Sequence, residues 1–272
     1  MEQGMDLSGK NVVITGGSQG IGEAMAEEFA KRGSKVLVAA RSADKLEIVA
    51  KRIGGEYLVA DLGNDDDVDG FVAAAIDKLG HIDVFVNNAG VETLERFVDV
   101  DRQRIRDLAR LNFEAPMMLS RDVLPHMVGR GSGHVVNLSS LAGTIAWPGL
   151  AAYAGSKAGV TNFTETLRME FADTDIGFTV VAPGPVDTDM WDRLESEEGS
   201  YVAPALKRFR RLGYLPKLKP AKVARQIVDA VAKGKPHVRP AVRYQTYHVL
   251  NNAPRRIVQL AMTGVKLEPP TA

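Results

Sequence analysis

Short apolar runs alternate along the chain with longer segments in which apolar residues recur every three or four positions. The first run, residues 12–15, is β-branched and is followed by glycines, after which Ile21, Met25 and Phe29 stand at helical spacing. A β-branched run of this length indicates a buried strand, and the longer period indicates one face of a helix. The chain is therefore predicted to open on a strand, a glycine-rich turn and a helix.

The same alternation repeats through the first two thirds of the chain. Further strands are predicted at residues 35–40, 56–60, 84–87, 134–138 and 177–181. Helices are predicted between them at residues 44–52, 65–79, 101–128 and 153–171. Strands that alternate with helices form parallel sheets covered on both faces. We predict an α/β fold, a Rossmann-type doubly wound parallel sheet of three layers, in a single domain spanning residues 1–272.

The regular alternation weakens after Pro183. Residues 187–215 mix aromatic residues with charges, a composition that suits a flap over a substrate pocket better than a core element. A further helix is predicted at residues 220–233, and residues 233–240 could supply a strand. Residues 235–272 form a basic extension.

Composition narrows the class of protein. The absence of cysteine excludes disulfides, thiolate nucleophiles and thiolate metal sites. Residues 1–10 carry acids and no apolar stretch, and no run approaches the roughly 18 apolar residues of a membrane-spanning helix. We expect no signal peptide and a cytoplasmic protein.

Positive charge gathers near the C-terminus although the whole chain is neutral. Residues 204–266 hold fifteen Lys or Arg and one acid, Asp229. The favoured interpretation is a solvated face, a cover for the pocket or a contact with a partner subunit. Peripheral contact with an anionic membrane is the alternative, because residues 257–262 include a short apolar stretch. No nucleic-acid partner is expected, since interleaved aromatic residues and a recognised motif are missing.

A glycine-rich turn follows the first predicted strand. It reads Thr15-Gly16-Gly17-Ser18-Gln19-Gly20-Ile21-Gly22. Free N–H groups and the positive end of the helix dipole meet at such a turn, and together they favour a pyrophosphate. We expect Gly16 to allow the tight turn, Gly20 to let the backbone approach the ligand, and Gly22 to let the helix pack closely on the strand. The turn predicts dinucleotide binding through Gly16, Ser18, Gln19, Gly20, Ile21 and Gly22.

Tyr153 and Lys157 stand four positions apart in a predicted helix, so their side chains share one face. A phenol is a weak acid with a pKa of about 10, and a neighbouring ammonium group favours its ionised form. The pair can therefore give and take a proton at a substrate oxygen. The alternative is an amphipathic helix with one exposed lysine.

The glycine-rich turn and five other motifs, in chain order, resemble those of the short-chain dehydrogenase/reductase family. They are the TGxxxGIG pattern of the turn, Asn87-Asn88-Ala89-Gly90, Asn112, Ser140, Tyr153 with Lys157, and Pro183-Gly184 followed by Thr188. The resemblance covers most of the chain to about Met190. It implies an oxidoreductase that moves a hydride between a nicotinamide cofactor and an alcohol or carbonyl substrate, with Tyr153 as proton donor and acceptor.

The resemblance also implies four catalytic residues, which are Asn112, Ser140, Tyr153 and Lys157. Ser140 would hydrogen-bond the substrate oxygen, and its spacing to Tyr153 favours it over Ser139, which we expect to be structural. Lys157 would contact the cofactor ribose as well as the phenol.

Asn112 also stands out on local grounds. Because Pro116 has no N–H, the carbonyl of Asn112 loses its helical partner four residues on. In the family a water at this place links the helix to the catalytic lysine. A simple packing kink is the alternative.

The end of the second predicted strand bears on the choice of cofactor. Ala40 stands where relatives that prefer NAD carry an acid, and Arg41, with Ser42 beside it, is placed for a 2′-phosphate. We predict NADP(H); the alternative is that Arg41 only solvates a loop.

Other cofactor contacts follow from the resemblance. Asp61 and Leu62 would lie at the adenine, where Asp61 accepts from the amine; a helix cap is the alternative, which Asn64 or Asp65 would serve better. The remaining implied contacts are Asn88, Ala89 and Gly90 on the adenosine side, and Pro183, Gly184, Val186 and Thr188 at the carboxamide.

The substrate is the least determined part of the prediction. An apolar alcohol or carbonyl compound is suggested by a set of candidate wall residues, part of which could be ordinary core: Leu141, Ile145, Trp147, Leu150, Met190 and Trp191. The five histidines show no metal-ligand spacing, so no metal is expected. A non-catalytic NADP(H)-binding sensor or scaffold, and an epimerase or dehydratase on the same fold, stay open. The resemblance implies a homodimer or a homotetramer.

Overall fold

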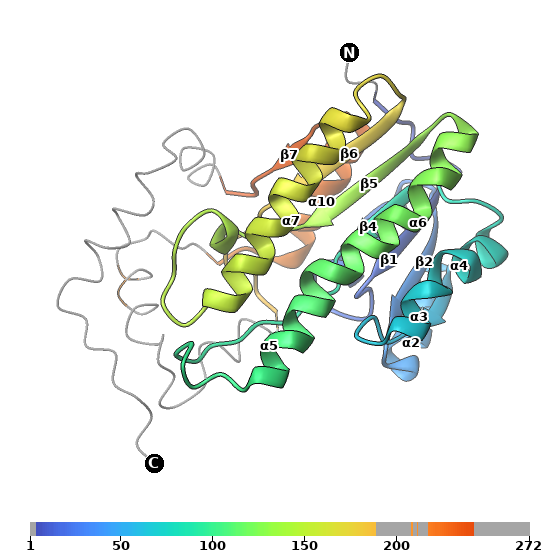
Figure 1. Cartoon of the computed structure of the whole chain (residues 1–272). Coiled ribbons are helices and arrows are strands. Elements are labelled where there is room, and N and C mark those ends of the chain that lie inside the picture. Colours follow the sequence, from blue (N-terminus) through green and yellow to red (C-terminus); the bar gives the residue numbers. More distant parts are fainter. Residues whose placement is uncertain (1–3, 189–207, 209–210, 212–216, 242–272) are drawn as a thin grey trace.

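One parallel sheet of seven strands runs through the residues that the computed structural model describes, which are 4–188, 208, 211 and 217–241 (Figure 1). The strand order is β3-β2-β1-β4-β5-β6-β7. The order therefore reverses between β1 and β4, which are hydrogen-bonded neighbours. Doubly wound sheets bind their ligands beyond the carboxyl ends of the strands at this reversal.

All six predicted strands are present, and their ends differ from the prediction by one residue at most. The strands are β1 (Asn11–Thr15), β2 (Lys35–Ala40), β3 (Glu56–Val59), β4 (Val84–Asn87), β5 (Gly133–Leu138), β6 (Ile176–Val181) and β7 (His237–Val238). The seventh lies inside the segment 233–240 that could supply a strand. The predicted α/β fold class is confirmed.

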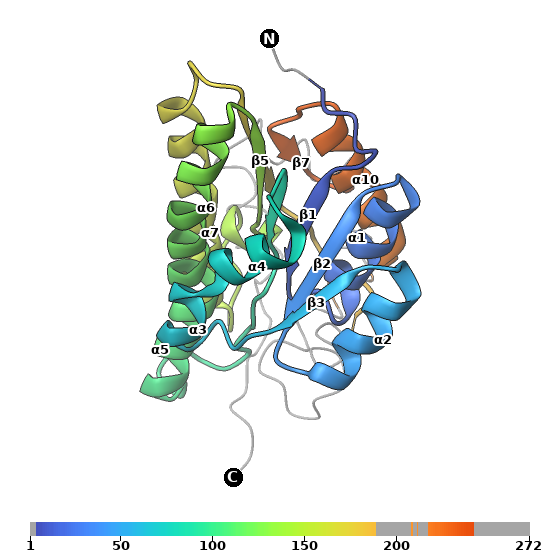
Figure 2. The same ribbon diagram turned by 90° about the vertical axis from the view of Figure 1, so that its right-hand side faces the viewer.

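Helices cover both faces of the sheet. They are α1 (Gly20–Lys31), α2 (Ala43–Ile53), α3 (Asp65–Asp69), α4 (Phe71–Leu79), α5 (Arg102–Ala109), α6 (Ala115–Arg130), α7 (Ala151–Glu170) and α10 (Pro220–Ala232). Figure 2 shows α1, α2 and α10 on one side of the sheet and α4, α6 and α7 on the other.

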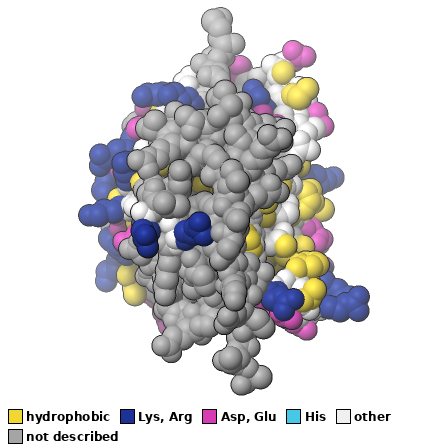
Figure 3. All heavy atoms as spheres, turned by 90° about the vertical axis from the view of Figure 1, so that its left-hand side faces the viewer, with side chains coloured by type: hydrophobic (Ala, Val, Ile, Leu, Met, Phe, Trp, Pro, Cys, Tyr) yellow, Lys and Arg dark blue, Asp and Glu magenta, His cyan; other side chains and the backbone are white. Residues whose placement is uncertain are grey.

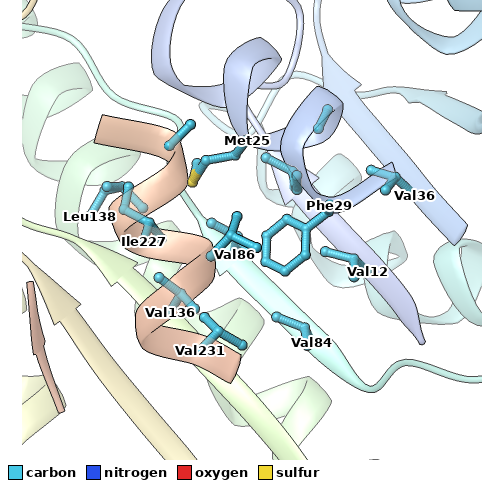
Figure 4. Close-up of a cluster of buried hydrophobic side chains, with 14 of the residues drawn as sticks. Val12, Met25, Phe29, Val36, Val84, Val86, Val136, Leu138, Ile227 and Val231 are labelled. Carbon is cyan, nitrogen blue, oxygen red and sulfur yellow. The ribbon is translucent and has the colours of Figure 1, made fainter. Parts of the chain in front are cut away.

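Successive side chains of each central strand enter different cores, because strand side chains alternate between faces. Val12 of β1 packs in the cluster that holds Phe29 of α1 and Ile227 of α10 (Figure 4). Val13, the next residue, packs in the other cluster with Leu119 of α6. Burying one such side chain contributes about 1.5–3 kcal/mol. The two cores fix the sheet between its helices and so place the carboxyl ends of the strands.

The predicted helix at residues 65–79 is wrong in one respect, because it is two helices. Gly70 ends α3 and precedes α4, with φ −92° and ψ −8°. Asn64 caps α3 by accepting from the N–H of Asp66. Apolar residues keep their helical spacing across Gly70, so the hydrophobic period alone did not indicate the break.

The predicted helix at residues 101–128 is also interrupted. A π-helical turn at Arg110–Glu114 separates α5 from α6, and the N–H of Ala115 donates to the carbonyl of Arg110, five residues back. Pro116 lacks an N–H, so the carbonyl of Asn112 has no donor four residues on. The wider turn accommodates the proline without ending the helix, and π-turns of this kind often mark functional sites.

The predicted flap at residues 187–215 is described only at Asp187, Thr188, Arg208 and Arg211, so most of it, Met190 and Trp191 included, lies outside the described residues. Its two flanking segments are held together. The N–H of Asp187 donates to the carbonyl of Leu218 at 2.8 Å, and the N–H of Leu218 donates to the carbonyl of Pro185 at 3.0 Å. The segments before and after the predicted flap are therefore hydrogen-bonded to each other beyond β6.

The basic extension is described as far as Ala241, and residues 242–272, with the apolar stretch 257–262, lie outside the described residues. Within the described part of the chain, no helix combines the length and the apolar character that crossing a bilayer would require.

Candidate active site

A cavity of about 840 Å³ opens at the carboxyl ends of the strands. Its lining contains every residue that the sequence predicted for cofactor binding or catalysis, apart from Asn112. The cofactor set in the lining is Gly16, Ser18, Gln19, Gly20, Ile21, Gly22, Arg41, Ser42, Asp61, Leu62, Asn88, Ala89, Gly90, Pro183, Gly184, Val186 and Thr188. Ser140, Tyr153 and Lys157 line the same cavity. Residues from seven separate chain segments thus meet in one hollow.

The glycine-rich turn packs so closely on its neighbours that two of its positions have no room for a side chain. Gly16 has a φ of +64°, and a Cβ added there would lie 2.9 Å from the Cα of Ala89. A Cβ on Gly22 would lie 2.2 Å from the carbonyl oxygen of Gly16, so the close packing of α1 on β1 requires a glycine. Gln19 precedes α1 and makes no side-chain cap. The first turn of α1 therefore presents its N–H groups toward the cavity, as an anion requires.

The end of β4 is tied to the turn by Thr15, whose role the sequence did not predict. The Thr15 hydroxyl accepts from the N–H groups of Asn88 and Ala89 at 3.0 and 3.1 Å. The Asn88 amide donates to the carbonyls of Thr15 and Gly16 at 2.9 and 3.0 Å. These bonds fix the two strand ends on either side of the reversal.

The ends of β2 and β3 also line the cavity. Arg41, which follows Ala40 at the end of β2, is exposed there. Asp61 and Leu62, which follow β3, also line the cavity. Asp61 accepts from the N–H of Gly63 at 3.0 Å rather than capping α3, since Asn64 is the cap. As expected from Ala40 in the sequence, β2 ends without an acidic residue.

Tyr153 and Ser140 are brought together although they stand thirteen positions apart in the sequence. Burial raises the pKa of the Tyr153 phenol to about 12; a hydrogen bond with Ser140 opposes this shift, and the charge of Glu92 adds to it. Ser140 also accepts from the N–H of Ala142 at 3.1 Å. Ser139 points away from this pair and donates to the carbonyl of Lys157 at 2.7 Å, as expected of a structural hydroxyl.

Lys157 lies at the base of the cavity and is 5 % exposed. Its Nζ donates to the carbonyl of Leu138 at 2.8 Å and lies 5.9 Å from the centre of the Tyr153 ring. Burial lowers the pKa of Lys157 to about 8. The sequence led us to expect that this ammonium group would lower the pKa of Tyr153. The shift has the opposite sign, because desolvation of the phenol outweighs a cation at this distance.

Asn112 is fully buried behind the cavity and does not line it. Its amide oxygen accepts from the N–H of Val91 at 2.8 Å, and its amide nitrogen donates to the carbonyl of Val91 at 2.7 Å. The same nitrogen lies 3.3 Å from the hydroxyl of Ser156. The side chain thus clamps the loop that follows β4 onto α7, between Tyr153 and Lys157.

The apolar wall agrees in part with the sequence prediction. Leu141, Ile145, Trp147 and Leu150 line the cavity. The sequence analysis missed Glu92, which also lines the cavity two residues beyond Gly90. Its position directly after Asn88-Ala89-Gly90, at the end of β4, could have indicated that it lines the cavity. The described residues contain no cluster of three or more His, Asp or Glu that could hold a metal ion.

Known proteins are similar to this chain in sequence. The model of the short chain dehydrogenase family matches residues 10–199. The 3-oxoacyl-(acyl-carrier-protein) reductase FabG of Vibrio cholerae is 33% identical over 196 residues, which are 71% of this chain and 80% of that protein. The 11-beta-hydroxysteroid dehydrogenase A of Sesamum indicum is 34% identical over 240 residues, which are 86% of this chain and 68% of that protein.

Solved structures agree with the fold. A short-chain dehydrogenase from Streptomyces avermitilis superposes with a TM-score of 0.77 at 28% identity, covering 94% of this chain and 95% of that chain. The family match spans well over half of the chain and includes the turn, Ser140, Tyr153 and Lys157. The chain belongs to the short-chain dehydrogenase family and is an oxidoreductase of that family.

Proposed function

We propose that this protein is an NADP(H)-dependent oxidoreductase that transfers a hydride between the nicotinamide and an alcohol or carbonyl carbon, with Tyr153 as proton donor and acceptor. The observation that carries the proposal is the meeting of Tyr153, Ser140 and Lys157 in the cavity that the glycine-rich turn also lines. A non-catalytic binding protein would need the turn but not these three side chains.

The protonation state of Tyr153 fits carbonyl reduction. With a pKa of about 12 the phenol keeps its proton at neutral pH. It is then in the form that can donate to a carbonyl oxygen as negative charge develops there. The resulting phenolate keeps the hydrogen bond from Ser140 and lies near the positive charge of Lys157, and both favour it. When bound, the nicotinamide supplies the hydride or takes it up.

The described residues fit a dinucleotide. The turn from Gly16 to Gly22 is open toward the cavity and offers backbone N–H groups to a pyrophosphate. The fixed segment at Pro185 to Thr188 lines the same cavity, with the Thr188 side chain beside Gly20, and would hold the carboxamide. Lys157 would contact the ribose. Because β2 ends on Ala40 and is followed by Arg41, with no acid at either position, the end of the cavity assigned to the adenosine favours a 2′-phosphate.

The substrate side favours an apolar compound. Leu141, Ile145, Trp147 and Leu150 line the cavity, and we assign them to the substrate. Two relatives are named a 3-oxoacyl-(acyl-carrier-protein) reductase and an 11-beta-hydroxysteroid dehydrogenase, and acyl chains and steroids are largely apolar. For this chain we propose a small-molecule ketone or secondary alcohol with apolar substituents.

Initial-rate measurements of a carbonyl panel with NADPH and NADH test both parts of the proposal. We expect NADPH to be preferred. The double variant Ala40→Asp with Arg41→Leu should lose that preference by roughly tenfold to a hundredfold, since a charge-assisted pair contributes about 1.5–3 kcal/mol. Arg41→Lys is the matched control, because it keeps the charge. A parent protein that already prefers NADH would refute the 2′-phosphate assignment.

Exposed apolar side chains on the outer helices bear on the assembly of the protein, which we propose is a dimer. Apolar side chains are exposed on the outer helices, among them Met118 and Val128 of α6 and Met169 of α7. Figure 3 shows hydrophobic side chains gathered along one flank of the molecule. These residues support the predicted dimer. We also propose a cytoplasmic location. For the basic extension, peripheral membrane contact is the alternative to covering the pocket or contacting a partner subunit.

A further inference from the structure

Consecutive residues at the carboxyl end of β5 each bind α7, the helix that carries Tyr153 and Lys157. The bonds, in chain order along the strand, are Asn137 to Thr164, Leu138 to Lys157, Ser139 to Lys157 and Ser140 to Tyr153. Along the strand the bonded partners move from the middle of the helix toward its N-terminus. The end of β5 therefore determines where α7 lies along the sheet.

Lys157 is bound both at its backbone and at its ammonium group, by two neighbouring residues of β5. Its Nζ donates to the carbonyl of Leu138 at 2.8 Å, and its backbone carbonyl accepts from the hydroxyl of Ser139 at 2.7 Å. Lys157 is 5% exposed and Ser139 is 3% exposed. A lysine side chain is long and flexible, so a helical backbone alone does not place its ammonium group. The two bonds together fix the side chain at its start and at its tip.

The bond from Ser139 exceeds what the helix itself requires. The carbonyl of Lys157 already has the N–H of Thr161 as its helical partner, and Ser139 uses the second lone pair. The hydroxyl of Thr161 lies 2.7 Å from that of Ser139 and 3.1 Å from the same carbonyl. A Cβ on Gly143 would lie 2.8 Å from the carbonyl carbon of Lys157, so the turn after β5 also packs on this peptide.

We propose that Ser139 is a positioning residue for Lys157: its bond to the Lys157 carbonyl fixes α7 where the ammonium group reaches both the carbonyl of Leu138 and the cavity. Ser139 acts through Lys157 and not on a substrate, because its one hydroxyl proton is donated to the helix. The effect on turnover rests on the proposed function, in which Lys157 serves catalysis and contacts the ribose.

Ser139→Ala removes the hydroxyl and leaves the backbone of β5 in place. We expect kcat to fall by roughly tenfold or more, because a small displacement of a catalytic group has a large effect on rate. Kd for NADPH should rise by about threefold to tenfold, whereas KM for the carbonyl compound should change by less than about threefold. Ser139→Thr keeps the hydroxyl and should restore most of kcat.

Thr164→Val is the matched control. Thr164 is 2% exposed, accepts from the Asn137 amide at 3.0 Å and lies on the same helix, about two turns beyond Lys157. Its loss removes a bond of the same kind between β5 and α7, so urea unfolding should show a comparable loss of stability. The kcat per folded molecule should stay within about threefold of the parent. An equal fall in kcat in both variants would contradict the assignment, because docking of the whole helix would then explain it.

The position of the ammonium group can be measured without turnover. Burial lowers the pKa of Lys157 to about 8. In protein with isotope-labelled lysine, the NMR signal that is missing in Lys157→Arg should titrate near this value. Ser139→Ala should raise this pKa toward the roughly 10.4 of a solvated lysine, because the ammonium group gains water, and Thr164→Val should leave it unchanged. An unchanged pKa in Ser139→Ala would overturn the assignment.

A second variant covers the case in which Ser139→Ala does not fold. Thr161→Val keeps the shape of the side chain and removes the hydroxyl beside Ser139. It should lower kcat and raise the pKa of Lys157 in the same directions, by smaller amounts. A variant that folds and changes neither quantity would refute the positioning role.

Failure of the proposed function is distinguishable from failure of this inference. A parent that reduces no carbonyl compound with NADPH or NADH would refute the proposed function, and the pKa of Lys157 in Ser139→Ala would then decide the positioning role alone. A parent that turns over, together with a Ser139→Ala variant that keeps both kcat and the Lys157 pKa, would refute this inference and leave the proposed function intact.

Discussion

Polar side chains that are buried or half-buried lie at both ends of the parallel sheet, but their hydrogen-bonding groups face different surroundings. At the carboxyl ends of the strands, Ser140, Tyr153 and Lys157 face a cavity. At the amino ends, Asp83 and His134 face other parts of the protein. Burial and polarity alone therefore do not separate a functional residue from a structural one.

The amino end is closed by mutual pairing. Asp83, which is 3% exposed, accepts from the N–H of Asn11 at 2.9 Å and lies 3.1 Å from His81. Lys10 and Arg130 approach its other oxygen at 3.8 and 3.5 Å. In the part of the chain that the structure describes, the groups that pair with Asp83 all come from the protein, and the cluster joins β1 to β4.

The carboxyl end is only partly paired. Ser140 accepts from one backbone N–H and is hydrogen-bonded to Tyr153, and Lys157 donates to one backbone carbonyl. A hydroxyl oxygen has two lone pairs, and an ammonium group carries three donors, so capacity remains for a ligand. The comparison predicts that substitutions at the carboxyl end change activity and that substitutions at the amino end change stability.

Tyr153→Phe should have the largest effect. Loss of the hydroxyl removes the proton donor and should lower kcat by about 10²- to 10⁴-fold. The ring keeps its packing, and Ser140 keeps its bond to Ala142, so the free energy of unfolding should change by less than about 1 kcal/mol. NADPH binding should persist, because the glycine-rich turn is untouched.

Initial rates, NADPH titration and urea unfolding measure the three quantities on one preparation. Activity within about threefold of the parent would remove Tyr153 from the proton-transfer step. A large loss of stability in the same variant would remove the contrast between the two ends of the sheet.

Features fixed by local chemistry could be predicted from the sequence. The strands, the turn at Gly16 and the shared helix face of Tyr153 and Lys157 depend on residues close together in the chain. The raised pKa of Tyr153 could not be predicted, because desolvation depends on the whole cavity wall. The pairing of Asn11 with Asp83 joins residues 72 positions apart, and no local pattern indicates it.

Asp83→Ala should be the strongest test of the amino end. The side chains of Lys10, His81 and Arg130 are 35%, 35% and 37% exposed, so water can replace the carboxylate around them. The main cost is that the buried N–H of Asn11 loses its acceptor, which typically costs about 1–3 kcal/mol. We expect a loss of about 2–3 kcal/mol in the free energy of unfolding, measured in urea, with kcat per folded molecule unchanged.

Asp99→Ala is the control, because Asp99 makes an exposed pair with Arg96 at 3.8 Å and such pairs contribute little. A stability loss in Asp83→Ala no larger than in this control would show that the buried cluster does not hold the strands together. A selective loss of kcat in Asp83→Ala would instead connect the amino end to catalysis.

His134 offers the smallest and most specific test of the amino end, through pH. Its Nε2 lies 2.8 Å from the hydroxyl of Thr179, which donates to the carbonyl of Lys235 at 2.8 Å. Since that hydroxyl has one proton, Nε2 carries the proton of the neutral ring and donates to Thr179.

Burial lowers the pKa of His134 to about 4, below the 6.5 of an unfolded histidine. The unfolded chain therefore binds more protons between pH 6.5 and 4, and stability falls as the pH falls through this window. From pH 7 to pH 5 the loss from this residue should be about 2 kcal/mol. His134→Gln keeps a donor for Thr179 but does not titrate, so its urea midpoint should fall less over the same interval. Equal pH dependence in both proteins would show that His134 is solvated or charged in the folded state, and the amino end would then not be the closed, self-paired end that its hydrogen bonds describe.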